Sequence, residues 1–248
     1  MEVFSFERRI KNYSNYQNIL LVGEGDFSFA ICLARAFDFA ANMVATSRDT
    51  RESLMVEYSK AMSNVEELES RECTVLHEVD VHYMSKHPCL INVRFDRIIY
   101  NFPHAGYLKG SRSCEREMYQ IWYHQDLVRG FFENAREMLT RVGEIHVTHK
   151  TTYPFSEWNI VDLAYQAGLI LVHKEPFSKW DYPGYENKRG AGMFDQTFPV
   201  GMCSTYKFAK MLDHSTTSGF HLGTTSSGPW PRYCGIWGPH CWIVAKLG

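Results

Sequence analysis

Short runs of apolar residues alternate along the chain with longer stretches in which apolar positions recur at helical spacing. The runs predict seven strands, at residues 19–22, 42–46, 73–81, 95–100, 144–148, 169–174 and 204–209. The stretches between them predict a helix through Leu33 and Phe37 and further helices at 51–68, 115–139 and 160–167. Gly143 is expected to end the third of these helices. Because strands that alternate with helices form βαβ units, the pattern predicts an α/β fold: a doubly wound, mostly parallel seven-stranded sheet with helices on both faces.

One folded domain is expected over residues 18–210, since a chain of 248 residues is long enough to build a full core. Residues 1–17 form an N-terminal extension before the first predicted strand. The Ser/Thr/Gly-rich and Trp-rich residues 211–248 predict a disordered tail. Between the last two strands, residues 181–201 are rich in Gly, Pro, Tyr and Phe. A loop of that length in a compact domain is more often functional than a simple connection.

Composition and charge narrow the class of protein. Apolar residues make up 45% of the chain, which excludes bulk disorder, and the net charge of −2 means that any contact with RNA must use local patches. The seven cysteines are scattered and odd in number, which favours reduced intracellular thiols over disulfides. No apolar run resembles a signal peptide or a membrane helix, and Cys234, His240 and Cys241 fit no metal-site spacing. The sequence therefore predicts an intracellular protein with neither a membrane partner nor a bound metal.

The sharpest motif is a glycine turn between the first predicted strand and the first helix. It consists of Gly23, Glu24, Gly25, Asp26, Phe27 and Ser28. A turn of this design binds nucleotide-like ligands in α/β sheets, and Asp26 or Ser28 can cap the helix that follows. It lacks both the Gly-Lys-Ser/Thr end of a Walker loop and the third glycine of a dinucleotide fingerprint. Its acids would repel a pyrophosphate but suit a ligand with a cationic part, such as S-adenosylmethionine. The alternative is an ordinary strand–turn–helix with solvated acids.

Polar residues also follow the next three predicted strands, whose carboxyl ends share one edge of the sheet. Asp49 can accept hydrogen bonds from both ribose hydroxyls of an adenosine, and Asp80 can accept one from the amine of its base. The fourth strand ends in Asn101, Phe102, Pro103 and His104. This run resembles the Asn/Asp-Pro-Pro-aromatic signature of methyltransferases that act on planar nitrogens, with an amide acceptor, a fixed backbone, a stacking ring and an imidazole that accepts a proton or orients the base. The alternative is a tight turn with a capping Asn and a buried Phe.

Seven motifs in collinear order carry a family resemblance. They are GEGDFSF, ATS-x-D, the Val79-Asp80 strand end, NFPHAG, the FFENA helix, GEIHVT and the YPGY-x-NKRG-x-G loop. Over about residues 18–210 the chain is similar to the ribosomal-RNA uridine-N3 methyltransferases, the BMT5-like family, of which plants hold many copies. The resemblance implies a Rossmann-like, S-adenosylmethionine-dependent enzyme that methylates N3 of a uridine in large-subunit ribosomal RNA. The turn at 23–28 would hold the methionine moiety, Asp49 and Asp80 the adenosine, and residues 101–104 the target base.

The implied partner is ribosomal RNA or a pre-ribosomal particle in the cytoplasm or nucleolus, and not DNA. Uridine N3 carries a proton on the Watson–Crick edge, so the base must be unpaired or flipped and a side chain must take the proton. The expected proton acceptor is His104 or His149. Candidate stacking residues are Phe102, Tyr107, Tyr182 and Tyr185, and candidate phosphate-binding residues are Lys188, Arg189, Lys109, Arg112 and Arg116. Two alternatives stay open: a non-catalytic adenosine-binding paralogue that acts as an interaction module, and a nicotinamide-dependent reductase.

Overall fold

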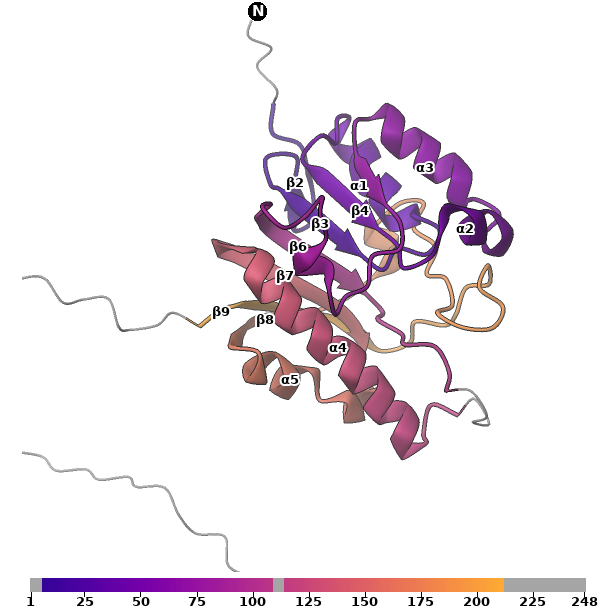
Figure 1. Cartoon of the computed structure of the whole chain (residues 1–248), viewed down its shortest axis with the longest axis vertical. Coiled ribbons are helices and arrows are strands. Elements are labelled where there is room, and N and C mark those ends of the chain that lie inside the picture. The colour runs from indigo at the N-terminus through magenta and orange to yellow at the C-terminus, as the bar shows by residue number, and fades with distance from the viewer. Residues whose placement is uncertain (1–5, 109–113, 212–248) are drawn as a thin grey trace, which may run out of the picture. The chain divides into compact units, whose positions relative to one another are not determined.

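A computed structural model of the chain describes residues 6–108 and 114–211 (Figure 1). A seven-stranded sheet forms its centre. In spatial order its strands are β5 (Thr74–Leu76), β4 (Met43–Thr46), β3 (Ile19–Val22), β6 (Phe95–Asn101), β7 (Leu139–Lys150), β9 (Cys203–Lys210) and β8 (Leu169–Pro176). The pairs from β5 to β7 are parallel, while β9 runs antiparallel to both β7 and β8. All seven predicted strands and the mostly parallel sheet are confirmed.

Helices cover both faces of the sheet, as the alternating pattern predicted. One face carries α1 (Ser28–Phe37), α2 (Arg51–Glu57) and α3 (Ala61–Ser70), and the other carries α4 (Met118–Met138) and α5 (Ile160–Gln166). Short 3-10 helices are η1 (Met84–Lys86), η2 (Phe155–Trp158) and η3 (Lys179–Asp181). Successive residues of β3 separate the two layers: Ile19 and Leu21 pack with the α1–α3 side, and Leu20 and Val22 with the α4 side.

Strand order places a crevice at the carboxyl ends of β3 and β6. From β3 the chain moves outward to β4 and β5, then crosses back to add β6 on the other side of β3. Ligands of open α/β sheets bind at such a switch point, because the loops after the two central strands diverge there. The sheet therefore presents the glycine turn and the Asn101 turn side by side.

Four predicted element boundaries are wrong, each for a local reason. The stretch 51–68 is two helices, because Tyr58 adopts an extended backbone (φ −132°, ψ 112°) between α2 and α3. Strand β5 is short, because Glu78 has a left-handed backbone (φ 57°) that turns the chain back across the end of β4. Helix α4 begins at Met118 rather than at residue 115. It ends at Met138 without help from Gly143, which lies inside β7.

The residues before β3 are part of the packed structure. Strands β1 (Arg9–Ile10) and β2 (Tyr13–Ser14) form a small hairpin. It places Tyr13 in the core at 2% exposure, with its hydroxyl 3.1 Å from His146 Nδ1. The packed unit therefore starts before residue 18. The predicted tail lies outside the described residues from residue 212 onward, as do Cys234, His240 and Cys241.

Two expectations from composition bear on the described residues. Five cysteines lie there, and all five have free thiols: Cys32, Cys73, Cys89, Cys114 and Cys203. Across residues 6–108 and 114–211, no helix combines the length and the apolar character needed to cross a membrane.

Candidate active site

A cavity of about 610 Å³ opens along the carboxyl ends of β3, β4 and β6. The turn after β3 contributes Gly23, Glu24 and Gly25 to its wall, and the segments after β4 and β5 contribute Asp49 and Asp80. These acids come from three separate strand ends and border one space. The predicted meeting of the three strand ends is therefore confirmed.

The turn itself depends on residues with a left-handed backbone. Gly23 has a φ of 66°, and a Cβ at this position would lie 2.5 Å from Cε2 of Tyr100. Phe27, which directly precedes α1, has a φ of 60° and a fully buried ring. The tight path keeps the backbone of the turn against the end of the sheet and leaves its outer side facing the cavity.

Both acids of the turn accept hydrogen bonds from the first turn of α1. Oδ1 of Asp26 accepts the Ser28 N–H at 3.0 Å, and Oε2 of Glu24 accepts the Ala30 N–H at 3.1 Å. Asp26 therefore satisfies a donor of the first turn, as predicted, and Glu24 satisfies a second one, although the N-cap residue itself is Phe27 and its side chain makes no capping hydrogen bond. Burial raises the pKa of Glu24 to about 8, opposed by the Ala30 hydrogen bond and reinforced by repulsion from Asp26. Within the described part of the chain no cation pairs with Glu24, so its pocket suits a positively charged ligand.

The long loop after β8 closes against this turn through Lys188. Its ammonium is 2.8 Å from Asp195 Oδ1, 3.0 Å from Glu186 Oε2 and 3.7 Å from Asp26 Oδ2, and its side chain is 6% exposed. Ser28 Oγ adds two hydrogen bonds to the backbone of Glu186. Lys188 therefore ties the loop to the glycine turn. Three carboxylates surround the Lys188 ammonium and neutralise its charge, so Lys188 is not suited to the predicted contact with an RNA phosphate.

Asp49 and Asp80 face the same cavity in different local settings. Asp49 is half-buried, and burial raises its pKa, opposed by the adjacent Arg48. Ser47 Oγ accepts the Asp49 backbone N–H at 3.3 Å. Asp80 is exposed, and its Oδ1 accepts the His82 N–H at 2.9 Å, which leaves Oδ2 for a ligand. Both carboxylates can accept hydrogen bonds from the hydroxyl or amine groups of a nucleoside.

The Asn101 turn forms the opposite wall. Phe102 adopts a left-handed backbone (φ 49°), and its N–H donates to Thr148 O at 2.8 Å. Its ring stands edge-on against Phe177 and Phe198. The side chain of Asn101 borders a narrow cavity of about 100 Å³, and both its Oδ1 and its Nδ2 are buried with no hydrogen-bond partner within residues 6–108 and 114–211. Since an unpaired buried amide is costly, the position is typical of a group that waits for a ligand.

A third cavity, of about 280 Å³, lies on the far side of this turn. Its walls are mainly aromatic and include Phe102, Pro103, Phe155, Trp158 and Phe198. His104 and Gly190 border all three cavities. The site is therefore a polar cavity and an aromatic cavity, joined by the narrow space in which the Asn101 amide lies.

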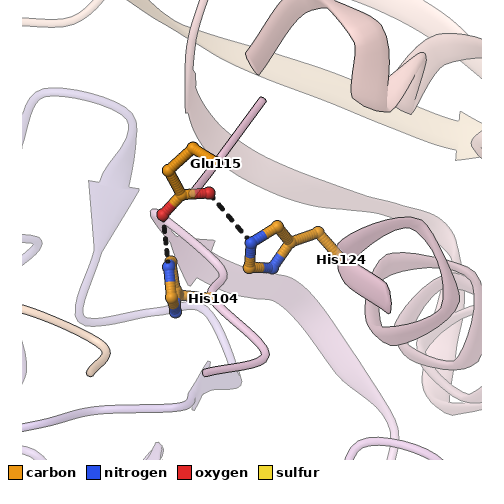
Figure 2. Close-up of side chains that lie close together, drawn as sticks. All are labelled: His104, Glu115 and His124. Carbon is orange, nitrogen blue, oxygen red and sulfur yellow. Dashed lines mark hydrogen bonds and ion pairs between the residues drawn. The ribbon is translucent and has the colours of Figure 1, made fainter. Parts of the chain in front are cut away.

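Figure 2 shows that the carboxylate of Glu115 bridges two imidazoles. Its Oε1 lies 2.8 Å from His104 Nε2, and its Oε2 lies 3.0 Å from His124 Nε2. Burial alone would raise the pKa of Glu115, but the hydrogen bonds from both histidines outweigh it and hold the pKa well below its usual value. Glu115 thereby fastens the Asn101 turn to α4, where His124 stacks on Trp158 at 4.2 Å.

These three residues are also spaced as metal ligands would be, with their donor atoms within 4.8 Å of one another. The hydrogen bonds of the Nδ1 atoms argue against metal binding at these residues. Nδ1 of His104 accepts the Gly106 N–H at 3.0 Å, and Nδ1 of His124 accepts the Ala105 N–H at 3.2 Å. Backbone N–H groups only donate, so each neutral ring carries its proton on Nε2, where Glu115 accepts it and where Gln120 Nε2 also lies 2.9 Å from that of His124. A metal-bound Nε2 has no proton, and Nδ1 is then the donor. The cluster is a hydrogen-bonded bridge.

The hydrogen bonds of the ring nitrogens also distinguish the two predicted proton acceptors, His104 and His149. Both nitrogens of His104 are occupied, so it orients the turn and has no free lone pair for a substrate. His149 borders the aromatic cavity, and its Nε2 donates to Phe155 O at 3.0 Å, which leaves Nδ1 as the unprotonated nitrogen. Burial lowers the pKa of His149 to about 4. It is therefore neutral at pH 7 and a weak base.

The other predicted RNA contacts lie in different surroundings. Tyr182 is 5% exposed and stacks on Phe177 at 5.7 Å inside the core, so a base cannot reach it. Tyr185 borders the narrow cavity, and Tyr107 and Arg189 border the aromatic one. Arg116 lies 5.9 Å from the centre of the Tyr153 ring, and Lys109 and Arg112 fall outside the described residues.

Comparison with known proteins places this chain in a family. A family model described as "rRNA (uridine-N3-)-methyltransferase BTM5-like", for BMT5-like proteins, matches residues 20–189. The chain belongs to the BMT5-like family. An uncharacterized protein of Arabidopsis thaliana is 51% identical over 208 residues, which cover 82% of this chain and 98% of that protein. The 25S rRNA (uridine(2634)-N(3))-methyltransferase of Saccharomyces cerevisiae is 23% identical over 263 residues, which cover 84% of this chain and 77% of the yeast protein.

A solved structure supports the same fold. The structure of NSun6 from Pyrococcus horikoshii with SFG superimposes with a TM-score of 0.52 at 17% identity, and the match covers 80% of this chain and 49% of that one. The predicted Rossmann-like methyltransferase fold of this BMT5-like chain is confirmed.

Three residues of the candidate site were given no role from the sequence: Glu115, His124 and Trp158. Glu115 and His124 fall in the helix predicted at 115–139, which has a wide apolar face. His124 gave a usable signal, because a polar ring on an apolar face needs a hydrogen-bond partner. Lys150 follows the strand predicted at 144–148 and was therefore expected at the same edge of the sheet as the Asn101 turn. Trp158 lies in a short segment without periodicity, and the sequence offered no signal for its approach to that turn.

Proposed function

We propose that this chain transfers a methyl group from S-adenosylmethionine to N3 of a uridine in large-subunit ribosomal RNA. The family description and the name of the yeast relative support the reaction class. The observation that carries the proposal is the unpartnered Asn101 amide between a polar cavity and an aromatic one. The methyl donor, bound in the polar cavity, and a flat base, bound in the aromatic cavity, would meet at this amide.

The polar cavity suits the methyl donor. Glu24 offers a buried carboxyl without a cationic partner to the positive part of the donor, and Gly23 and Gly25 allow its close approach to the backbone. Asp49 would accept from the ribose hydroxyls and Asp80 from the adenine amine. A volume of about 610 Å³ is ample for a molecule of this size.

The aromatic cavity suits an unstacked base. Uridine N3 lies on the pairing edge, so the enzyme must receive the base unpaired or flipped, and aromatic walls replace the stacking that the base loses. Phe102 and Trp158 supply such walls. The Asn101 amide offers both a donor and an acceptor, which complement the carbonyl oxygens and the N3–H of an imide edge.

Methyl transfer is a displacement at the sulfonium carbon. The N3–H bond breaks and leaves its electron pair on nitrogen, the proton goes to Nδ1 of His149, and the pair attacks the methyl carbon. The carbon–sulfur bond breaks, its electrons go to sulfur, and a neutral thioether leaves. Most of the acceleration would come from holding N3 in line with the methyl group. Arg189 and Tyr107 at the mouth of the aromatic cavity are the remaining candidates for contacts with flanking RNA.

The test is transfer of a labelled methyl group to unmodified large-subunit ribosomal RNA or to pre-ribosomal particles, followed by nucleoside analysis. We expect N3-methyluridine with the wild type and a loss of about 100-fold or more with Asn101→Ala. Asn92→Ala, an exposed asparagine in the segment before β6, is the matched control and should retain full activity. Donor binding without transfer to any RNA would contradict the proposal and favour the non-catalytic adenosine-binding alternative.

A further inference from the structure

Lys150 ends β7 at the aromatic cavity, and no acidic side chain in the described part of the chain pairs with it. Its ammonium lies 4.8 Å from the ring centres of both Phe155 and Phe198. Among the described residues no hydrogen bond or ion pair holds its side chain, and it is half-buried. Lys188 and Lys207, which are also withdrawn from solvent, both pair with carboxylates. A half-buried ammonium that lacks such a partner is typical of a site that receives an anion.

Trp158, which lines the same cavity, carries a second donor without a partner among the described residues. Nε1 of Trp158 is buried and has no hydrogen-bond partner. Indole and ammonium groups only donate, so the two orphaned groups of this cavity call for acceptors. A uracil ring presents carbonyl oxygens on both sides of N3. A cytosine or adenine ring presents an amine at its pairing edge, which would oppose these donors.

The reaction also creates a need for positive charge here. An imide is a much weaker acid than a protonated imidazole of pKa about 4, which is what His149 becomes on taking the proton. Proton transfer from N3 to His149 is therefore uphill unless the anion left behind is stabilised. A fixed charge placed where negative charge develops is usually the largest single contribution to such a step.

We propose that the Lys150 ammonium binds a carbonyl oxygen of the target uracil and stabilises the negative charge that spreads over O2, N3 and O4 as the N3 proton leaves. The proposal rests on the proposed function and adds a catalytic residue to it. The bonds that form and break are those of the methyl transfer described above. Lys150 keeps its own proton throughout and donates a hydrogen bond.

The charges around Lys150 permit this role. Burial lowers its pKa, and Arg189 on the long loop acts in the same direction. Glu115, before α4, and the Cys203 thiol of β9 act in the opposite direction and favour the charged form. The neighbouring His149 is neutral at pH 7 and adds no repulsion there. The carboxylate of Glu115 is taken up by its two histidines, so it does not cancel the ammonium.

The test compares Lys150→Met, which keeps the bulk and removes the charge, with Lys150→Arg, which keeps the charge. Lys86→Met, on the exposed surface of η1, is the matched control. In single-turnover methyl transfer at pH 7 we expect Lys150→Met to be roughly 100- to 1,000-fold slower, with unchanged affinity for S-adenosylhomocysteine and partial recovery in Lys150→Arg. A loss confined to KM for RNA, or no loss, would overturn the proposal.

A binding measurement separates this proposal from the proposed function. The fluorine NMR signal of 5-fluorouridine 5′-monophosphate reports ionisation of N3 and needs no methyl transfer. With S-adenosylhomocysteine present, the wild type should lower the pKa of the bound nucleotide by about one unit or more, equivalent to a tenfold preference for the anion. Lys150→Met should abolish the shift. An equal shift in that variant, or no binding by the wild type, would overturn the role of Lys150. The expected shift without transfer to any RNA would instead contradict the proposed function.

Discussion

The buried carboxyl of Glu24 predicts that donor binding releases a proton. Glu24 is 9% exposed, it accepts one hydrogen bond from Ala30 N–H, and burial raises its pKa to about 8. Without ligand, most molecules at pH 7 therefore hold Glu24 protonated. A donor whose ammonium or sulfonium lies against this group favours the carboxylate, so binding and loss of the proton are coupled.

The size of this coupling follows from the pKa. A group with a pKa of about 8 is about 1% ionised at pH 6, about 9% at pH 7 and about half ionised at pH 8. If the bound form requires the carboxylate, affinity for S-adenosylhomocysteine rises about 50-fold from pH 6 to pH 8, or about 2.3 kcal/mol. At pH 7 each binding event releases about 0.9 proton.

Calorimetry in two buffers of different ionisation enthalpy measures this proton count directly. Glu24→Gln keeps the shape and the acceptor oxygen for Ala30 but cannot ionise, so its affinity should be lower at pH 8 and independent of pH between 6 and 8. A proton count near zero in the wild type, or the same pH dependence in Glu24→Gln, would show that ionisation of Glu24 is not coupled to donor binding.

The same pKa sets the stability of the ligand-free protein. The folded pKa lies above the ordinary value of 4.5, so the folded state binds this proton more tightly than the unfolded state does. The resulting stabilisation is complete below about pH 4.5 and is lost as the pH rises through about 8. At pH 7 Glu24→Gln should therefore raise the free energy of unfolding by up to about 3 kcal/mol, measured by urea denaturation.

Three further predictions concern the bridge and the loop. Glu115→Gln should lower the free energy of unfolding at pH 7 by about 1.5–3 kcal/mol in urea denaturation, because it replaces two charged hydrogen bonds with weaker ones. The pKa of Glu115 is lowered, so this difference should shrink as the pH falls below the ordinary value of 4.5, and an unchanged midpoint at pH 7 would contradict the bridge. Gly190→Ala places a Cβ 2.5 Å from that of His104 and should slow methyl transfer roughly 10- to 100-fold, whereas an unaffected rate would mean that the loop yields freely. Removal of divalent ions with EDTA should change neither the thermal midpoint nor the transfer rate, and a fall in either would indicate that the bridge binds a metal.

Much of the fold was predictable because its determinants are local. The four apolar residues from Ile19 to Val22, bounded by Gly23, define a covered strand without reference to any distant residue. The placement of the strand ends along one edge followed from the parallel sheet alone. The boundaries that failed depended on single backbone conformations, such as the left-handed Glu78 that shortens β5, which apolar periodicity does not record.

The candidate site divides in the same way. The glycine turn and Asn101 were recognisable because each motif lies in consecutive residues directly after a strand. Lys188 was expected to face RNA, yet its ammonium is enclosed by the carboxylates of Asp26, in the turn before α1, and Asp195, in its own loop. Nothing within a few residues of Lys188 in the sequence indicates Asp26 as a partner, because the contact spans more than one hundred and fifty positions.

From the sequence alone came the α/β architecture, the order of its strands along the chain and the chemistry offered at the strand ends, because periodicity, glycine and chain direction act between neighbours. The tertiary structure decided which of those side chains remain free. His104 lost its role as proton acceptor because Gly106 and Glu115 occupy both its nitrogens, and Lys150 became a candidate because, among the described residues, no carboxylate pairs with its ammonium. A side chain is available for chemistry only if no distant segment of the chain supplies it with a partner, and those contacts form only in the folded chain.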